Sequence, residues 1–440
     1  MFKSFLYFIL LSTAITYGQS EFKFENNKKK IVIPFTLINN LVFVPLNLNG
    51  EELTFLLDTG VEETVILSID ETQDLKLHNV ETIKLRGLGS NEAVDGYKSS
   101  NNRVELNGFV DTKHELYIIL DQEFNFSAQI GIPVNGILGY HFFKNHLVEI
   151  DYQHKKVIIY REKSAKLSNK LRRRFHKDSI SIELSKPYLI TEIEQNENII
   201  KSKLLLDTGN SDAIWLFSNK QKKIAPPIKN IEDYLGRGFS GNVYGKRGRI
   251  QSFKFGNKTF ENPIVTFPDS TSLKSVNFVP GRLGSIGGEV ISRFNVFFDY
   301  KEQAIYTSPN HKINEPFSFN MSGIDVEHAG LEWGTETIQE RSSGIKVYTN
   351  KDTSYEPNFK IKFSLKPIFK IFNVRIASEA EKAGLKKGDK IIRINGTHAH
   401  NLSIERINKL LKEEDGRTIL FEIERDGKNL KIRFPLKNIL

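Results

Sequence analysis

The stretch KLLLDTGNSDAIWLF, from Lys203 to Phe217, places an aspartate directly after three leucines and then turns the chain on a glycine. The stretch TFLLDTGVEETVIL, from Thr54 to Leu67, repeats this pattern in the first half of the chain. Both read as apolar strands, and burying an unpaired carboxylate at the end of such a strand is unfavourable. An Asp-Gly turn that only closes its own loop would explain one copy. Two copies favour a shared role.

The two stretches belong to an internal repeat. Asp207 lies 149 positions after Asp58, and three pairs of glycines keep the same spacing. The segment GILGYHFFKNHLVEIDY at 136–152 also matches GSIGGEVISRFNVFFDY at 284–300, at an offset of 148. The repeat predicts two homologous lobes, 28–162 and 178–309, joined by a basic linker at 163–177. The glycine pairs are Gly87 with Gly236, Gly89 with Gly238, and Gly96 with Gly245.

Composition and strand signals indicate mainly β lobes in a folded protein. The 440 residues are 39% hydrophobic and 26% charged, as in ordinary globular chains. Short segments rich in Val, Ile, Phe and Tyr, such as LVFVPLNL at 41–48, are separated by Asn, Gly and Lys turns. This pattern is typical of strands and hairpins.

The N-terminus has the three parts of a secretory signal peptide. Lys3 is followed by an apolar run from Phe5 to Leu11 and by small or polar residues around Gly18. The run is shorter than the roughly 20 apolar residues of a membrane span. The chain has no cysteine, so it lacks both disulfides and the residue that carries a bacterial lipid anchor. We therefore expect a signal peptide at 1–20 and an exported protein, periplasmic or secreted, of a Gram-negative-type bacterium, with no membrane-spanning segment after cleavage.

The repeat would bring Asp58 and Asp207 together if the lobes pack about a pseudo-two-fold axis. Two carboxylates in contact do not both ionise readily, so one keeps a proton at a pH where the other is charged. The ionised carboxylate can take a proton from a water that attacks a peptide carbonyl, while the protonated one donates to the carbonyl oxygen. The sequence therefore predicts amide hydrolysis without a covalent intermediate.

At this point the chain resembles the aspartic proteases of the pepsin and retropepsin superfamily. DTGNSDAIW is close to their signature D-T-G-x-S-x-x-x-W, and GILG and GSIG resemble the apolar-apolar-Gly element behind each catalytic loop. The resemblance implies a mainly β, pepsin-like bilobal fold of two retropepsin-like β-barrel lobes related by pseudo-two-fold duplication. It implies Asp58 and Asp207 as the catalytic pair. It also implies supporting loop residues Thr59, Gly60, Thr208, Gly209 and Ser211, and flap glycines Gly87, Gly89, Gly236 and Gly238.

Two residues depart from the family pattern, because Val61 and Asn210 stand where Ser, Ala or Thr usually follows D-T-G. Val61 cannot hydrogen-bond Asp58, so we expect a raised carboxyl pKa and activity shifted toward neutral pH. Alternatively, Val61 crowds the first loop and the chain is a catalytically impaired peptide-binding or scaffold protein of the cell envelope. Tyr97 and Tyr244 are both candidates for a flap tyrosine.

The C-terminal third has a different character. AGLKKGDKIIRING at 383–396 resembles a segment of bacterial PDZ domains, which are small α+β peptide-binding modules. The resemblance implies a PDZ-like domain at 322–440 with a polar insertion at about 329–363. MSGID at 321–325 resembles the loop that binds a peptide carboxylate, with Gly323 and Ile324 at the diagnostic positions. A helix with one apolar face is expected from Ser403 to Glu413.

Other chemistry has little support in the sequence. The ten histidines form no H-E-x-x-H motif, and HAH at 398–400 is expected to be an exposed loop, so no metal or other cofactor is expected. Part of the net charge of +9 lies at 161–177, which suits an anionic surface or nucleic acid but is more simply a solvated linker. We expect polypeptide substrates, a C-terminal peptide as candidate ligand of the PDZ-like domain and no nucleic acid. We also expect a monomer, because each chain has both D-T-G turns.

Overall fold

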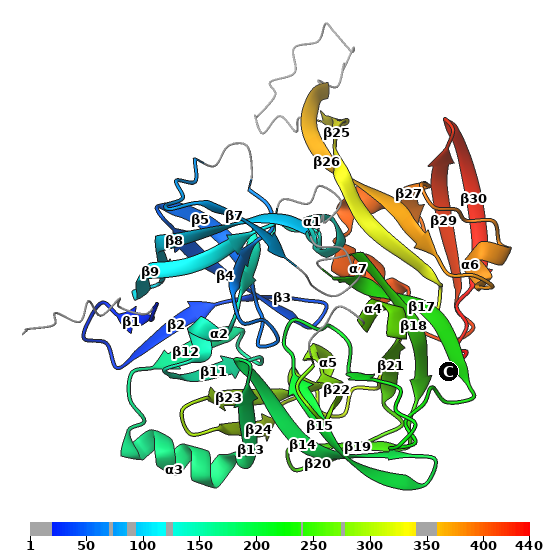
Figure 1. Cartoon of the computed structure of the whole chain (residues 1–440). Helices are drawn as coiled ribbons and strands as arrows, with labels where there is room; N and C mark the ends of the chain where they lie inside the picture. The colour runs from blue at the N-terminus through cyan, green and yellow to red at the C-terminus, as the bar shows by residue number, and fades with distance from the viewer. Residues whose placement is uncertain are drawn as a thin grey trace, which may run out of the picture.

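The chain is mainly β, with short helices between the strands (Figure 1). Within the described part of the chain, no helix is long and apolar enough to cross a membrane. The expected signal peptide lies almost entirely outside the described residues. This computed structural model describes residues 20–69, 74–85, 94–119, 126–238, 241–273, 278–339 and 359–440.

A first sheet surrounds the turn that holds Asp58, in the order β1-β9-β6-β10-β5-β4-β8-β7, with β3 beside β4. Asn-Gly turns close two of its hairpins. Asn49 and Gly50, and likewise Asn107 and Gly108, have positive φ, as a type I′ turn requires. The strands are β1 (Lys23–Phe24), β3 (Thr36–Ile38), β4 (Leu41–Leu48), β5 (Glu51–Leu57), β6 (Thr64–Ile66), β7 (Glu81–Leu85), β8 (Val94–Leu106), β9 (Phe109–Ile118) and β10 (Gly136–Leu138).

The strands around Asp207 follow the order β17-β18-β21-β16-β22-β15-β14, with β19 beside β14 and β20 beside β19. Their inward side chains are large and apolar, and Phe253, Phe255 and Phe267 are almost completely buried. The strands are β14 (Lys186–Gln195), β15 (Asn198–Leu206), β16 (Ile214–Leu216), β17 (Asn230–Gly238), β18 (Gly241–Arg249), β19 (Ser252–Phe255), β20 (Lys258–Glu261), β21 (Ile264–Pro268) and β22 (Arg282–Ile286).

Strands from both halves meet in a continuous ladder, β13-β24-β23-β11-β12-β2. At its centre β11 pairs antiparallel with β23, and Glu149 lies opposite Phe297. This ladder joins the halves through backbone hydrogen bonds (Figure 1). Its strands and the short helices of the two halves are β2 (Lys30–Pro34), β11 (Leu147–Asp151), β12 (Lys156–Tyr160), β13 (His176–Glu183), β23 (Phe294–Asp299), β24 (Ala304–Pro309), α1 (Phe126–Ile130), α2 (Tyr140–Phe143), α4 (Ser270–Leu273) and α5 (Gly288–Ile291).

The basic stretch expected to be a solvated linker contains a packed helix, α3 (Ala165–Arg174). Ser164 caps its N-terminus by accepting a hydrogen bond from Leu167 N. Leu167 and Leu171, spaced by one helical turn, are buried against the central ladder with Phe297. The arginines lie in the last turn, where positive charge is favourable.

The C-terminal sheet has the order β25-β26-β27-β29-β30, with β28 beside β27. The ends of the expected polar insertion continue the long β25–β26 ladder, and residues 340–358 lie outside the described part. The expected helix at Ser403 is α7, capped by the Ser403 hydroxyl, and it buries Ile404, Ile407 and Leu410 as predicted. The elements are β25 (Ile324–Gln339), β26 (Phe359–Val374), α6 (Glu379–Lys382), β27 (Lys390–Ile394), β28 (Thr397–His398), a 3-10 turn (Ala399–Asn401), α7 (Ile404–Leu410), β29 (Thr418–Arg425) and β30 (Lys428–Pro435).

The HAH segment differs from the exposed loop that was expected. His398 ends β28, and His398 and His400 are half-buried with their rings stacked at 4.9 Å. His398 Nε2 lies 2.9 Å from an Arg393 guanidinium nitrogen. No group of three or more His, Cys, Asp or Glu side chains with the spacing of a metal site occurs among the residues described.

Candidate active site

Each predicted catalytic aspartate lies at the end of a strand that is backed by a parallel neighbour. Asp58 follows β5, and its backbone N–H donates to Leu138 O in β10 at 3.0 Å. Asp207 follows β15, and its N–H donates to Ile286 O in β22 at 2.9 Å. The apolar GILG and GSIG segments therefore hold the two aspartates in matching ways.

The two D-T-G turns interlock through their threonines. Thr59 N–H donates to Thr208 Oγ1 at 3.0 Å, and Thr208 N–H donates to Thr59 Oγ1 at 3.1 Å. Each hydroxyl then donates to a carbonyl of the opposite strand, Thr59 to Leu206 O and Thr208 to Leu57 O. Both threonines are fully buried. A hydroxyl is needed here because it accepts one bond and donates another.

The glycines of the turns lie against the carboxylate of the opposite half. A Cβ added to Gly60 would stand 2.8 Å from Asp207 Oδ1, and one added to Gly209 would overlap the Asp58 carboxylate. Gly60 N–H also donates to Asp58 Oδ1 at 2.6 Å. The structure therefore brings Asp58 and Asp207 to a common centre, and only glycine leaves room for them.

Burial sets the protonation of this pair. Burial and the neighbouring Asp207 carboxylate raise the pKa of Asp58 to about 7. Burial also raises the pKa of Asp207, against the lowering influence of the Arg282 and Lys186 cations. The pair therefore keeps a proton well above the pH at which an ordinary aspartate loses it.

Lys186 and Arg282 are functional candidates that the sequence analysis missed. Lys186 begins β14 and lowers the pKa of both aspartates, and Arg282 begins β22 and lowers the pKa of Asp207. The Arg282 guanidinium donates to Gly284 O and to Ser285 Oγ. Neither cation lies in a motif, so no local sequence signal marked it.

The residues after the two D-T-G turns follow equivalent backbone paths. Val61 O accepts from Tyr140 N at 3.0 Å, and Asn210 O accepts from Gly288 N at 2.6 Å. The Val61 side chain is partly buried and packs on a small apolar cluster of the first half. The backbone carbonyls of Val61 and Asn210 are therefore bonded alike, whereas the Asn210 side chain also accepts from Asp212 N at 3.0 Å, a bond that valine cannot make.

Two hairpin turns reach across to the loop that follows the D-T-G turn of the opposite half. Asn40, between β3 and β4, donates from Nδ2 to Ser211 O at 3.1 Å. Ser185, between β13 and β14, donates from Oγ to Glu62 Oε1 at 2.8 Å. The predicted supporting residue Ser211 thus contributes its carbonyl to a contact between the halves.

Asp212 anchors the loop that follows Asp207. Its carboxylate accepts from Trp215 Nε1 at 2.7 Å, from Thr266 and from Arg247 at 2.8 Å. Against the raising effect of burial, Arg247 and these hydrogen bonds hold the pKa of Asp212 below its usual value. Arg247 also donates to Asp233 in β17 at 2.8 Å. The sequence signal that could have identified this pair is the spacing of Asp212 and Trp215 in DTGNSDAIW.

The predicted flap glycines fall into two groups. Gly87 and Gly89 lie outside the described residues. Gly236, at φ +132°, and Gly238 lie near the end of β17 in the β17–β18 hairpin. This hairpin packs on the C-terminal domain, because the ring of Tyr234 lies 5.4 Å from that of Phe372 in β26.

The candidate flap tyrosines differ in their partners. Tyr97 and Tyr244 are both largely exposed. The ring of Tyr244 lies 5.6 Å from that of Tyr234, so it also belongs to the β17–β18 hairpin. These exposures and the ring contact do not assign either tyrosine to a position over the aspartates.

The predicted carboxylate loop of the C-terminal domain has its donors engaged. Gly323 has φ +81°, and a Cβ there would meet Ser378, so glycine is required. The N–H groups of Ser322 and Gly323 donate to Asn320 Oδ1 at 3.1 and 3.2 Å, and Ile324 N–H donates to Ser322 Oγ at 3.2 Å. The N–H groups of the predicted carboxylate loop are therefore bonded to side chains of the loop itself in this structure.

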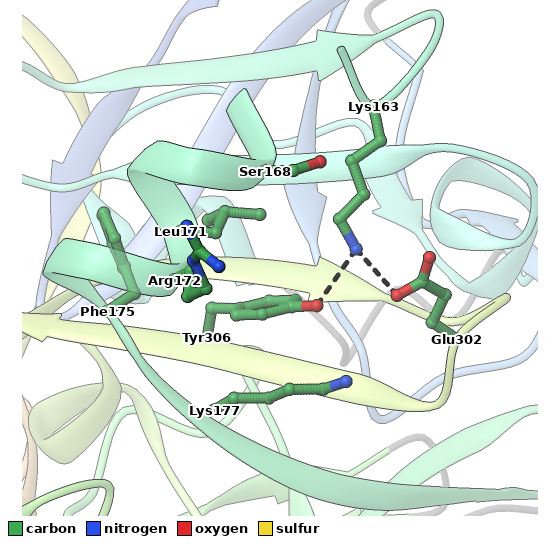
Figure 2. A pocket seen from close by; sticks show the side chains of 8 residues that line it. All are labelled: Lys163, Ser168, Leu171, Arg172, Phe175, Lys177, Glu302 and Tyr306. Carbon is green, nitrogen blue, oxygen red and sulfur yellow. Dashed lines mark hydrogen bonds and ion pairs between the residues drawn. The ribbon is translucent and has the colours of Figure 1, made fainter. Parts of the chain in front are cut away.

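A separate hollow of about 460 Å³ lies beside α3 (Figure 2). Lys163 points from its wall toward Tyr306 and Glu302, at 3.0 and 2.7 Å. Since its ammonium is compensated by Glu302 and also by Asp299, the basic stretch offers less free charge than its sequence indicates.

Comparisons with known proteins identify two parts of the chain. Residues 44–142, which include Asp58 and end within α2, match the family model described as aspartyl protease. Residues 344–436 match the model of the PDZ domain. No curated protein matches the sequence. The protein therefore has an aspartyl protease domain and a C-terminal PDZ domain, as the sequence motifs predicted.

Proposed function

We propose that this protein is an aspartic endopeptidase in which Asp58 and Asp207 act as one pair. The observation that carries the proposal is the reciprocal hydrogen bonding of Thr59 and Thr208, which ties the two D-T-G turns together around both carboxylates. The aspartyl protease domain at 44–142 supports the same class of reaction.

The proposed architecture is two homologous lobes related by a pseudo-two-fold axis. Glu149 and Phe297 occupy equivalent positions of the repeat and lie opposite each other in an antiparallel pair. An axis through this pair would exchange the two halves. The crossing contacts of Asn40 and Ser185, each to the loop that follows the D-T-G turn of the other half, support the same relation.

The mechanism uses a water held between the carboxyl groups. The ionised carboxylate takes a proton from the water as its oxygen attacks the peptide carbonyl carbon, and the protonated carboxyl donates to the carbonyl oxygen. In the resulting diol, one hydroxyl returns its proton to the second carboxylate while the C–N bond breaks. The leaving nitrogen takes the proton from the first carboxyl. The pair ends with one proton, ready for the next cycle.

In this proposal the PDZ domain recruits the substrate. The PDZ domain would bind segments of polypeptide substrates and so raise their local concentration near the aspartates. The setting that we propose is the periplasm or the outside of the cell, on the basis of the N-terminal sequence.

The proposal is tested by cleavage of an unfolded protein and a mixed peptide substrate by the purified protein between pH 3 and 8. Asp58→Asn and Asp207→Asn are assayed beside it. We expect activity in the wild type and a loss of at least 1,000-fold in both variants, since general acid and base catalysis each contribute about 10²–10⁴. A folded wild type that binds peptides without cleaving them would favour the impaired, peptide-binding scaffold instead.

A further inference from the structure

The edge of the PDZ sheet is covered by the protease domain. Strand β25 is the outermost strand of that sheet, and α1 of the protease domain lies against both β25 and α7 (Figure 1). PDZ domains bind an extended peptide between such a strand and helix. We call this space the β25–α7 groove. Its occupant in the structure is a segment of the same polypeptide.

The contacts of α1 and of the glycine after it join the β25–α7 groove to the protease domain. A Cβ added to Gly131, which follows α1, would stand 2.8 Å from Ile404 Cγ2 at the start of α7. Gln129 Nε2 donates to the Tyr234 hydroxyl at 3.3 Å, and Tyr234 also packs on Phe372 of β26. Ile130 is buried in the apolar cluster on which Val61 packs. The segment therefore contacts the PDZ domain, the β17–β18 hairpin and the core beside the first catalytic loop.

The other part of a PDZ peptide site, the carboxylate loop, is occupied as well. Asn320 Oδ1 accepts hydrogen bonds from the N–H groups of Ser322 and Gly323, which would otherwise face a carboxylate oxygen. Asn320 Nδ2 donates to Ile324 O at 2.6 Å. Arg375 donates to Asn320 O at 3.2 Å and fixes this residue further. A terminal carboxylate would have to displace these bonds, and its buried charge would find no free N–H in the loop.

We propose that the β25–α7 groove binds internal apolar segments of a polypeptide rather than its free C-terminus, and that α1 is its resident occupant. This inference rests on the recruiting role proposed above for the PDZ domain. An incoming segment must displace α1. The exchange is feasible because α1 is a helix of five residues, and so short a helix has little stability of its own.

The first test compares two forms of one ligand on the Asp58→Asn variant, which we expect not to cleave it. The probe is a fluorescein-labelled peptide FNFSAQIGIP, the sequence of residues 124–133, with a free carboxylate or with an amide at its C-terminus. We expect equal affinities within about twofold. Affinity at least tenfold higher for the free carboxylate, or no binding of either form, would overturn the inference.

The second test asks whether α1 competes with the peptide. Ala128 lies within α1 and is buried, and glycine there weakens the helix and its packing. We expect Ala128→Gly to tighten peptide binding by about fivefold, the effect of a helix-interior glycine. The matched control is Ala165→Gly in α3, which should leave affinity unchanged. Unchanged or weaker binding by Ala128→Gly would contradict the displacement of α1.

A reversible cross-link compares tethered and released α1 in a single variant, so the strain of a side chain at Gly131, with φ +81°, is the same in both states. The protein has no cysteine, and a Cβ at Gly131 would lie 3.2 Å from Ile404 Cβ, near the roughly 3.5–4.5 Å of a disulfide. In Gly131→Cys/Ile404→Cys we expect oxidation to abolish peptide binding and reduction to restore it. Equal binding by both forms would show that the peptide binds elsewhere. Because binding is the readout, this result is separate from any failure of catalysis.

Discussion

At the residue scale, Asp58 and Asp207 form an unfavourable pair that the fold maintains. The pKa of Asp58 is about 7 in the folded protein, against an ordinary value of 3.8. The folded protein therefore binds a proton that the unfolded polypeptide releases between about pH 4 and 7. The stabilisation from this proton is complete at acid pH and is lost as pH rises toward 7.

Replacing Asp58 by an amide should therefore stabilise the protein at neutral pH. We expect the unfolding free energy of Asp58→Asn at pH 7.5 to exceed that of the wild type by about 2–4 kcal/mol, since one pKa unit corresponds to about 1.4 kcal/mol. The variant should therefore unfold at a higher temperature. The difference should shrink toward pH 4. Thermal unfolding across this range is the measurement, with Asp426→Asn in an exposed turn as control. A variant less stable than the wild type at pH 7.5 would refute the account.

The cation of Lys186 should set the upper pH limit of activity. Lys186 lowers the pKa of both aspartates, so Lys186→Met should raise them and move the alkaline limb of kcat/KM to higher pH. The control is Lys201→Met on the exposed side of β15. If the alkaline limb of kcat/KM in Lys186→Met stays in place or moves to lower pH, Lys186 does not act on the pair.

The residues at the centre differ in how far the sequence predicted them. Asp58, Asp207 and their threonines were predicted, because the repeat and the D-T-G tripeptides mark them twice. Lys186 and Arg282 were not, because only the folding of β14 and β22 brings them close to the pair. The raised pKa of Asp58 was expected from Val61, whereas burial and Asp207 are its causes.

At the element scale, the interlocked turns depend on two hydroxyl groups. Thr208→Val removes an acceptor for Thr59 N–H and a donor for Leu57 O, both buried. Each unsatisfied buried group costs about 1–3 kcal/mol, so we expect a loss of about 2–5 kcal/mol in urea unfolding and a marked loss of activity. Thr208→Ser keeps the hydroxyl and should stay within about 1 kcal/mol. Equal effects of the two substitutions would mean that the hydrogen bonds are not what matters.

Elements with a local signal were predicted well. Turns of Asn, Gly and Lys between the strands were expected, and the Asn-Gly pairs at Asn49 and Asn107 are two of them. The helix expected from Ser403 is α7. The helix α3 was missed, because its run of charges concealed the apolar pair Leu167 and Leu171 and the cap at Ser164.

At the scale of the whole molecule, the PDZ domain is connected to the loop that follows Asp207. Arg375 lies 3.6 Å from Asp233 in the β17–β18 hairpin. Asp233 pairs with Arg247, and Arg247 pairs with Asp212, five residues after Asp207. This arrangement could not be predicted, because it joins isolated charges from three distant segments.

Removing Arg375 should loosen the β17–β18 hairpin. Arg375 is almost fully buried, and breaking a buried pair costs about 3–5 kcal/mol. We expect Arg375→Met to raise amide hydrogen exchange in the hairpin at least tenfold, as measured by mass spectrometry. Arg417→Met, at an exposed pair with Glu413, is the control. Unchanged exchange in the hairpin would show that the two domains are held together by other contacts.

The central claim is that one polypeptide supplies both aspartates of a single hydrolytic site. The most direct measurement is the cleavage rate of a peptide substrate by the wild type, by Asp58→Asn, by Asp207→Asn and by an equimolar mixture of the two variants. We predict activity in the wild type alone and none above background in the other three. Activity in either single variant, or activity regained in the mixture, would contradict a site built within one polypeptide.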